Sequence, residues 1–138
     1  MQELMANSDI ETLSNTRQNR YIVNPKETIL VTGANGFIGS KVVHTLLSCG
    51  FKHVRCLTRS TSTSMNLEAI IKEFDKSNVE IMKGNLLSRD DCTAAAKDAS
   101  IVYHLAAGVE KSFPGCFLNS VVTTRNLLDA VIKQQKLK

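Results

Sequence analysis

The stretch Thr32-Gly33-Ala34-Asn35-Gly36-Phe37-Ile38-Gly39 decides the fold of this chain. It follows a short apolar run at residues 28–31 and precedes apolar residues at helical spacing between 42 and 47. In a G-x-x-G-x-x-G loop between a strand and a helix, Gly33 permits a tight turn. Gly36 lets the backbone approach a pyrophosphate, and Gly39 lets the helix pack closely on its strand. We therefore expect an anion site at the start of the helix, rather than an ordinary strand-to-helix turn.

Length and composition limit the classes of protein to which the chain can belong. Its 138 residues are enough for one domain, and its net charge of +4 suits an anionic ligand. Nucleic acid is not expected as a partner, because there is no arginine-rich run and only 5% of the residues are aromatic. No segment approaches the ~20 apolar residues needed to cross a membrane. The N-terminus lacks the pattern of a secretory signal, so we expect a cytoplasmic protein with no membrane partner.

The four cysteines do not form a recognisable metal site. They stand at positions 49, 56, 92 and 116, with no C-x-x-C pair. Without an export signal, this pattern is typical of reduced thiols. No metal ligand is assigned.

The remaining chain alternates predicted strands and helices. Residues 1–26 have the composition of a flexible tail, and residues 27–138 that of a folded domain. Strands are predicted at 28–32, 53–58, 79–82 and 101–105. Helices are predicted at 37–48, at 65–76, from an N-cap at Ser88 through Lys97, and at 116–136. The last helix is expected to face inward with Leu118, Val121, Val122, Leu128, Val131 and Ile132.

This alternation predicts a doubly wound α/β fold of the Rossmann type with a parallel sheet. The strand order should be 3-2-1-4, an incomplete version of the fold. Its ligand crevice should lie at the carboxyl ends of the strands, between the first and the fourth, where the winding reverses.

The chain resembles the extended short-chain dehydrogenase/reductase superfamily, and within it the NAD-dependent epimerase/dehydratase family. The resemblance rests on four motifs in family order: Thr32 to Gly39, Gly84-Asn85-Leu86, Tyr103-His104-Leu105-Ala106-Ala107, and Asn126-Leu127-Leu128-Asp129-Ala130. It implies a dinucleotide cofactor. It also implies cofactor-binding residues in three groups: Gly33, Asn35, Gly36, Phe37, Ile38 and Gly39 at the pyrophosphate loop; Asn85 and Leu86 against the adenine; and Ala106, Ala107 and Gly108 on the ribose and nicotinamide side.

The end of the second predicted strand bears on which cofactor is bound. NAD-selective members carry an acidic residue about 20 positions past the glycines, which binds the ribose hydroxyls. This chain has Thr58-Arg59-Ser60 there, and its next acid is Glu68. Arg59 could bind a 2′-phosphate with help from the Ser60 hydroxyl, so NADP(H) is favoured over NAD. The alternative is that Arg59 is a solvated loop residue.

The catalytic motif of the family is absent from these residues. Members use a tyrosine as acid or base, with a lysine four positions later that lowers the tyrosine pKa. Here Pro25 and Ala107 stand four positions after Tyr21 and Tyr103, and no catalytic residue is assigned. His104 and Lys111 are interpreted as a packed core histidine and a solvated loop lysine.

Two functions therefore stay open. The chain is expected to be the dinucleotide-binding portion of an oxidoreductase or epimerase, truncated before the catalytic and substrate-binding half and inactive alone. The alternative is a non-catalytic module that senses the dinucleotide or binds a partner. Because the fourth strand would form an apolar sheet edge, we also expect self-association through it.

Overall fold

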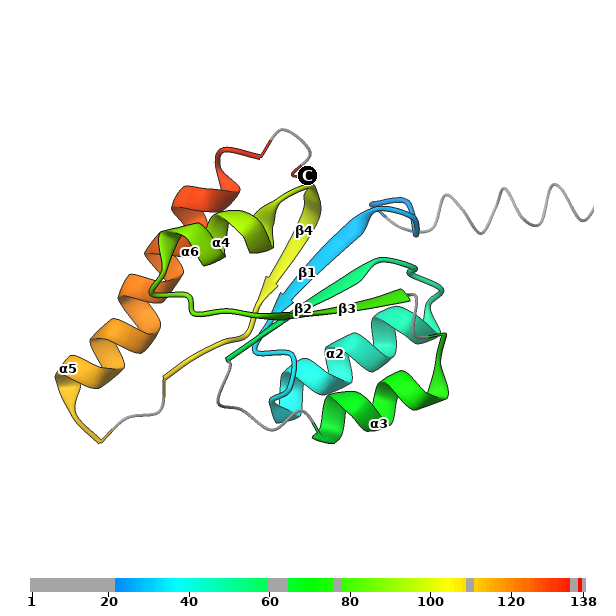
Figure 1. Cartoon of the computed structure of the whole chain (residues 1–138), viewed down its shortest axis with the longest axis horizontal. Coiled ribbons are helices and arrows are strands. Elements are labelled where there is room, and N and C mark those ends of the chain that lie inside the picture. Colours follow the sequence, from blue (N-terminus) through cyan, green and yellow to red (C-terminus); the bar gives the residue numbers. More distant parts are fainter. Residues whose placement is uncertain (1–21, 60–64, 76–77, 109–110, 135–136, 138) are drawn as a thin grey trace, which may run out of the picture.

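The strands of the chain form one parallel sheet in the computed structural model, which describes residues 22–59, 65–75, 78–108, 111–134 and 137. The four strands of the described part are β1 (Thr28–Thr32), β2 (Val54–Thr58), β3 (Val79–Lys83) and β4 (Ala99–His104). They are arranged in the order β3-β2-β1-β4 (Figure 1). The predicted fold class and strand order are confirmed.

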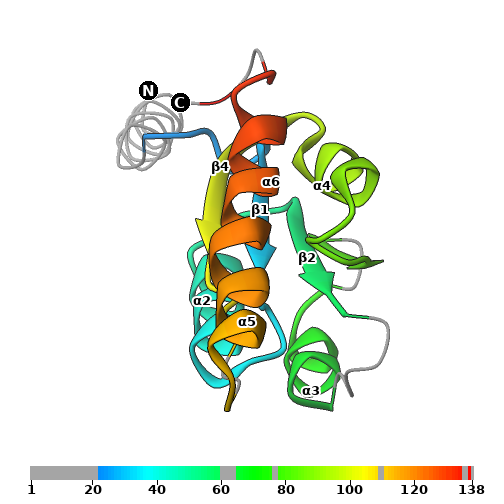
Figure 2. The same cartoon turned by 90° about the vertical axis from the view of Figure 1, so that its left-hand side faces the viewer.

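Helices cover both faces of this sheet. Helices α2 (Phe37–Ser48) and α3 (Met65–Glu73) lie on one face, and α4 (Arg89–Ala96) and α6 (Thr123–Val131) on the other (Figures 1 and 2). Alternate residues of β1 pack against the helices on one face of the sheet or the other, because successive strand side chains point to opposite faces. Ile29 and Val31 pack with Val43 and Leu47 of α2, while Leu30 packs towards α4 and α6.

Local sequence signals account for most of the element boundaries. Helix α2 spans the predicted residues 37–48, between the glycine loop and Gly50, whose φ of 88° suits a helix stop. The Ser88 hydroxyl caps α4 by accepting the Asp91 N–H, as expected. The first strand, predicted at 28–32, also has the predicted bounds. The remaining strand and helix ends before residue 105 agree with the prediction or differ from it by one to three residues, for example at α3, which ends at Glu73.

The last predicted helix is wrong in its start, its end and its inward face. It begins with α5 (Phe113–Cys116), continues through a π-helical turn (Phe117–Val122) and becomes α6, which ends at Val131. Of the six residues expected to face inward, only Val131 is buried; Val122 is half-buried, and four are exposed: Leu118, Val121, Leu128 and Ile132. The buried face consists of Thr123, Asn126, Leu127, Ala130 and Val131.

The reason for this error is that the helix carries two apolar stripes. Periodicity alone cannot say which stripe meets the sheet, and the buried one includes two polar residues. Thr123 and Asn126 tolerate burial because their side chains hydrogen-bond to backbone carbonyls.

The core extends N-terminally to Val23, which is 3% exposed and packs with the α2 layer. Pro25 O accepts the Lys52 N–H at 2.9 Å, which joins this segment to the loop before β2. The rest of the expected N-terminal tail, residues 1–21, lies outside the described residues. Among the described helices, none has the length and apolar character that crossing a membrane requires.

Candidate functional site

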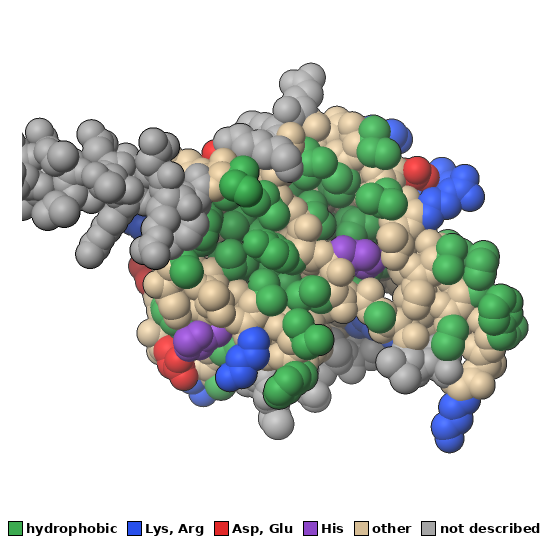
Figure 3. All heavy atoms as spheres, turned by 180° about the vertical axis from the view of Figure 1, so that it is seen from behind, with side chains coloured by type: hydrophobic (Ala, Val, Ile, Leu, Met, Phe, Trp, Pro, Cys, Tyr) green, Lys and Arg blue, Asp and Glu red, His purple; other side chains and the backbone are tan. Residues whose placement is uncertain are grey.

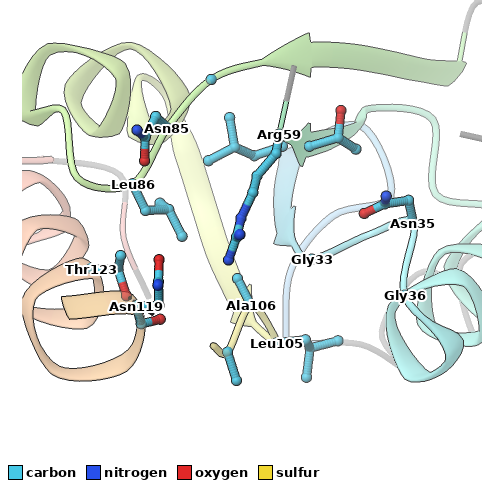
Figure 4. Close-up of a pocket in the computed structure, with 14 residues that line it drawn as sticks. Gly33, Asn35, Gly36, Arg59, Asn85, Leu86, Leu105, Ala106, Asn119 and Thr123 are labelled. Atoms are coloured by element: carbon cyan, nitrogen blue, oxygen red, sulfur yellow. Dashed lines mark hydrogen bonds between the residues drawn. The ribbon is translucent and has the colours of Figure 1, made fainter. Parts of the chain in front are cut away.

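A cleft of about 390 Å³ opens at the carboxyl ends of the strands. The winding of the sheet reverses at this end between β1 and β4, and the cleft also reaches the ends of β2 and β3. Figure 4 shows the glycine loop on one side of the cleft, Asn85, Leu86, Asn119 and Thr123 on the other, and Arg59 between them. Its lining residues are Gly33, Asn35, Gly36, Leu57, Thr58, Arg59, Gly84, Asn85, Leu86, Leu105, Ala106, Ala107, Asn119 and Thr123.

The glycine loop places the start of α2 at this cleft. Gly33 has a φ of 67°, and a Cβ there would lie 2.8 Å from the Ala106 nitrogen, so both the turn and the close approach require glycine. The Gly36 N–H donates to Gly33 O at 3.0 Å, which closes the turn. No side chain caps α2 at Gly36, and its first turn has no acid. The helix therefore offers backbone N–H groups and the positive end of its dipole to an anion.

The loop after β3 forms the opposite wall and is held from two helices. The Asp91 carboxylate of α4 accepts the Asn85 N–H at 2.7 Å. From α6, the Asn126 amide donates to Leu86 O at 3.0 Å and to Leu87 O at 3.1 Å. Asn85 Oδ1 accepts the Leu87 N–H within the loop, so the Nδ2 amide is the group of Asn85 that remains for a ligand.

The end of β2 contributes one buried hydroxyl and one exposed cation. Thr58 is 2% exposed, and its Oγ1 is the buried side-chain polar atom without a hydrogen-bond partner among the described residues. The next residue, Arg59, is exposed, and its side chain extends over the cleft (Figure 4). The sequence expectation for Ser60 cannot be compared, because Ser60 lies outside the described residues.

The end of β4 forms the floor. The Thr32 hydroxyl of β1 accepts the N–H groups of Leu105 and Ala106 at 3.2 and 3.3 Å. These bonds hold the backbone of β4 against Gly33 at the point where the chain leaves the sheet. The floor is thus built from backbone and small side chains.

The cleft brings together eight of the thirteen residues expected to bind a cofactor: Gly33, Asn35, Gly36, Arg59, Asn85, Leu86, Ala106 and Ala107. Gly39 is buried beneath the loop, where a Cβ would lie 2.1 Å from Gly33 O. Phe37 and Ile38 are 81% and 65% exposed and do not line the cleft. Gly108 packs on Asn119 and donates its N–H to the Ser120 hydroxyl at 3.4 Å. Six further residues line the cleft but were not predicted from the sequence to bind a cofactor: Leu57, Thr58, Gly84, Leu105, Asn119 and Thr123.

The buried thiols near the cleft are not reactive groups. Burial raises the pKa of Cys56 to about 12, and burial also raises the pKa of Cys92, with a smaller contribution from the Asp91 carboxylate. Both thiols therefore stay protonated at neutral pH and behave as small apolar side chains. In the part of the chain that the structure describes, no group of histidine, cysteine and acidic side chains could hold a metal ion.

A family comparison agrees with this geometry. The model of the family described as "NAD dependent epimerase/dehydratase family" matches residues 29–138. The chain belongs to this family. The match includes the glycine loop, the loop after β3, the end of β4 and the α6 motif, which are the four motifs of the resemblance.

Individual members of the epimerase/dehydratase family show the extent of the similarity. Cinnamoyl-CoA reductase 1 of Oryza sativa subsp. japonica is 32% identical over 117 residues, which cover 85% of this chain and 34% of the reductase. The solved structure of Pen from Bacillus thuringiensis is 28% identical, with a TM-score of 0.68, and the match covers 82% of this chain and 36% of Pen. The chain thus spans about a third of the length of these relatives.

A more distant solved structure shares the fold. It is a double mutant of the dTDP-glucose 4,6-dehydratase DesIV from Streptomyces venezuelae, whose structure has NAD and DAU bound. It is 23% identical, with a TM-score of 0.65, and the match covers 75% of this chain and 35% of that one. The family match over residues 29–138, rather than this structure, supports an NAD(P)-binding unit of the epimerase/dehydratase type.

Proposed function

We propose that the chain binds NADP(H) in preference to NAD(H), as the cofactor-binding portion of a reductase or epimerase. Three features support the fit of a dinucleotide. The start of α2 is uncapped and free of acid, Gly33 and Gly36 place no side chain in the cleft, and Thr58 keeps a buried hydroxyl without a protein partner among the described residues. When bound, the nicotinamide would supply hydride chemistry, while the residues described here would bind and orient it.

The two ends of the dinucleotide would meet different walls. The pyrophosphate would bind at the Gly33–Gly36 turn, and the adenine beside Asn85 and Leu86. Because Asn85 Oδ1 is engaged with the Leu87 N–H, Asn85 would donate from Nδ2 to an acceptor nitrogen of the adenine. The nicotinamide end would lie over Ala106 and Ala107, where small side chains leave room for a ring.

The observation that carries the NADP(H) preference is the position of Arg59 over the cleft, immediately after Thr58. A guanidinium matches a phosphate through two parallel hydrogen bonds. The acid that would repel this phosphate and bind a ribose diol is absent at this strand end. A cation at this point is therefore favourable to a 2′-phosphate.

Calorimetric titration with NADP⁺ and NAD⁺ tests this preference. Arg59→Ala should weaken NADP⁺ by ~1.5–3 kcal/mol, the range for a hydrogen bond to a charged group, and leave NAD⁺ nearly unchanged. Arg125→Ala is the matched control, since Arg125 is exposed on α6 and outside the cleft lining. Equal losses for both cofactors would show that Arg59 does not recognise the 2′-phosphate.

A second candidate function, a non-catalytic sensing or interaction module, is favoured by one observation. Neither Tyr21 nor Tyr103 has a lysine four positions later, so neither phenol has the neighbour that would lower its pKa. The purified chain should then bind NADPH without oxidising it in the presence of sugar-nucleotide, steroid, aldehyde or ketone substrates. Turnover followed by loss of NADPH absorbance would exclude the non-catalytic module.

We also propose that the chain self-associates through β4. Among the described strands, β4 pairs only with β1, so its other edge has unpaired backbone groups. Tyr103 and Leu105 are partly exposed there, and Figure 3 shows hydrophobic side chains gathered over this face. Sedimentation should detect association that weakens in Leu105→Lys; a monomer at every concentration would contradict it.

A further inference from the structure

His104, at the end of β4, joins the two other elements that meet below the cleft. Its Nδ1 lies 2.7 Å from the Thr32 hydroxyl of β1, and its Nε2 lies 2.9 Å from the Thr124 hydroxyl of α6. The register of the sheet places Thr32 directly opposite His104. The ring thus bridges β1 and α6 through two hydroxyls, and each hydroxyl restricts which ring nitrogen carries a hydrogen.

The Thr124 end determines the state of Nε2. Thr124 Oγ1 lies 2.6 Å from Ser120 O, and a carbonyl oxygen can only accept. The single hydroxyl hydrogen of Thr124 is therefore used in this bond. Thr124 must accept from the ring, so Nε2 carries a hydrogen.

The Thr32 end agrees with this tautomer. Thr32 Oγ1 faces the backbone N–H groups of Leu105 and Ala106, which can only donate; the Leu105 N–H is shared with Thr32 O at 3.3 Å. Because these donors occupy the acceptor side of the hydroxyl, its own hydrogen points to the ring. Nδ1 is then an acceptor, so both ends fit the same neutral tautomer, with the hydrogen on Nε2.

We propose that His104 is a positioning residue of the nucleotide cleft: as the neutral Nε2–H tautomer, it orients the Thr32 hydroxyl that holds the Leu105 and Ala106 amides. The proposal deepens the nucleotide-binding function proposed above and rests on it for its role. The ring does not line the cleft. It acts through Thr32 on two residues that do, and Thr32 also ends the strand that leads into Gly33.

Protonation of His104 would disrupt this arrangement. A hydrogen on Nδ1 would face the Thr32 hydroxyl hydrogen, and Thr32 would have to give up a backbone N–H to accept from the ring. The groups that face the ring are the hydroxyls of Thr32 from β1 and Thr124 from α6, and none of the described charged side chains hydrogen-bonds to it. Burial, without any charged neighbour, lowers the pKa of His104 below its ordinary value.

The sign of the pH dependence follows from this direction. A lowered pKa means that the folded state binds fewer protons than the unfolded state as the pH falls below the ordinary imidazole value of about 6.5. The stabilisation is complete above that value and is lost as the pH falls to the lowered pKa of the folded state. In the folded state the ring protonates around this lowered pKa, and the order of the Leu105–Ala106 segment should be lost there.

Nuclear magnetic resonance of the full ¹⁵N-labelled chain without nucleotide tests the proposal directly. Long-range ¹H–¹⁵N spectra should show the Nε2–H tautomer of His104 at about pH 7.5, above the ordinary imidazole pKa. As the ring protonates, the Ala106 amide should lose protection from hydrogen exchange beyond the intrinsic change with pH, and the Leu105 amide less so, because it also donates to Thr32 O. An Nδ1–H tautomer, or unchanged protection when the ring protonates, would overturn the proposal.

Variants separate positioning from a merely structural role. Thr32→Ser keeps the hydroxyl and should keep both the tautomer and the amide protection, whereas Thr32→Val should lose the protection of Ala106. The Leu105 N–H should lose less, because it keeps Thr32 O as an acceptor. His53→Gln is the control, since His53 is exposed before β2. Loss of protection in Thr32→Ser equal to that in Thr32→Val would contradict the role of the hydroxyl.

The nucleotide then tests the role of the network in binding. NAD⁺ is the probe, because the 2′-phosphate of NADP⁺ itself titrates near pH 6. NAD⁺ affinity should fall as His104 protonates, and this fall should persist in His53→Gln and vanish in His104→Gln. A pH-dependent tautomer and amide protection without nucleotide binding would refute the proposed function while leaving the network intact.

Discussion

Two parts of the cleft differ in how completely the protein satisfies their polar groups. We call the floor at the ends of β1 and β4, with Thr32 beneath it, the β1–β4 wall, and the end of β2, with Thr58, the β2 wall. At the β1–β4 wall, the Thr32 hydroxyl has three polar neighbours, and the histidine beside it uses both ring nitrogens. At the β2 wall, the Thr58 hydroxyl is equally buried and has no partner among the described residues. Two threonines at corresponding strand ends thus have opposite surroundings.

This difference indicates which wall the ligand completes. A buried polar group without a hydrogen bond costs about 1–3 kcal/mol, so such groups are rare away from functional sites. At the β1–β4 wall, the hydrogen bonds of the Thr32 hydroxyl are all made within the protein. At the β2 wall, a ligand hydroxyl or phosphate that reached Thr58 Oγ1 would supply the missing hydrogen bond, and we propose that this bond contributes to nucleotide affinity.

The largest expected effect tests whether the two walls form one site, because they meet at the glycine turn. Gly36→Val should fill the space for the pyrophosphate and weaken nucleotide binding by about 3 kcal/mol or more, the contribution of one or two hydrogen bonds to a charged group. The fold should survive, since the added Cβ lies 3.2 Å from Gly33 O, a contact that small shifts relieve. Calorimetry measures binding and thermal melting measures the fold.

The matched control is Gly50→Ala, at the opposite end of α2. Gly50 has a φ of 88° in open surroundings, so alanine there should cost roughly 1 kcal/mol of stability through backbone strain. It should leave nucleotide affinity unchanged. Unchanged affinity in Gly36→Val, or a comparable loss in Gly50→Ala, would mean that the turn is not the anion site.

The next effect concerns the β1–β4 wall, where the Thr32 hydroxyl has its hydrogen bonds within the protein. Thr32→Val keeps the shape of the side chain and removes the hydroxyl, leaving His104 Nδ1 and the Ala106 N–H without their partner. The free energy of unfolding in urea should fall by about 1–3 kcal/mol, the cost of unsatisfied buried groups. Thr32→Ser should recover most of it. An unchanged free energy of unfolding in Thr32→Val would contradict the difference proposed between the β1–β4 and β2 walls.

The smallest effect is an increase in stability, and it concerns the β2 wall, where the Thr58 hydroxyl has no partner among the described residues. Thr58→Val removes a hydroxyl that has no partner, so the chain without nucleotide should gain roughly 1 kcal/mol of stability. Nucleotide affinity should fall by about 0.5–1.5 kcal/mol, the net value of one neutral hydrogen bond. The same urea and calorimetric measurements apply. Destabilisation by Thr58→Val would show that its hydroxyl has a structural partner after all.

Local signals explain how much of the fold the sequence could predict. The bounds of α2 follow from glycines at both ends, and the cap of α4 from Ser88 and Asp91, which are neighbours in sequence. The inward face of α6 could not be read in the same way. Asn126 is buried because it donates to carbonyls about forty positions away, and no local pattern encodes such partners.

The residues of the candidate site likewise fall into those predicted from a local motif and those that depend on the folded structure. The glycine turn is a continuous motif, and spacing alone predicted its conformation and its place at the cleft. Thr58 and Leu105 stand next to predicted residues but were missed, because burial and a missing partner are properties of the folded structure. Asp91 was not predicted as a site residue, whereas its carboxylate holds the Asn85 N–H at the edge of the cleft.

The π-helical turn at Phe117–Val122 makes this part of the chain sensitive to insertions and deletions. A π turn accommodates one residue more than an α turn. Removing one residue from the turn would restore α geometry, so α5 and α6 would stay in phase while the residues inside the turn change their angular positions. Asn119 would then move relative to the cleft, and the Ser120 hydroxyl relative to the Gly108 N–H. Changes of length within the turn should therefore alter the cleft, even where the flanking helices and each single substitution in the turn are tolerated.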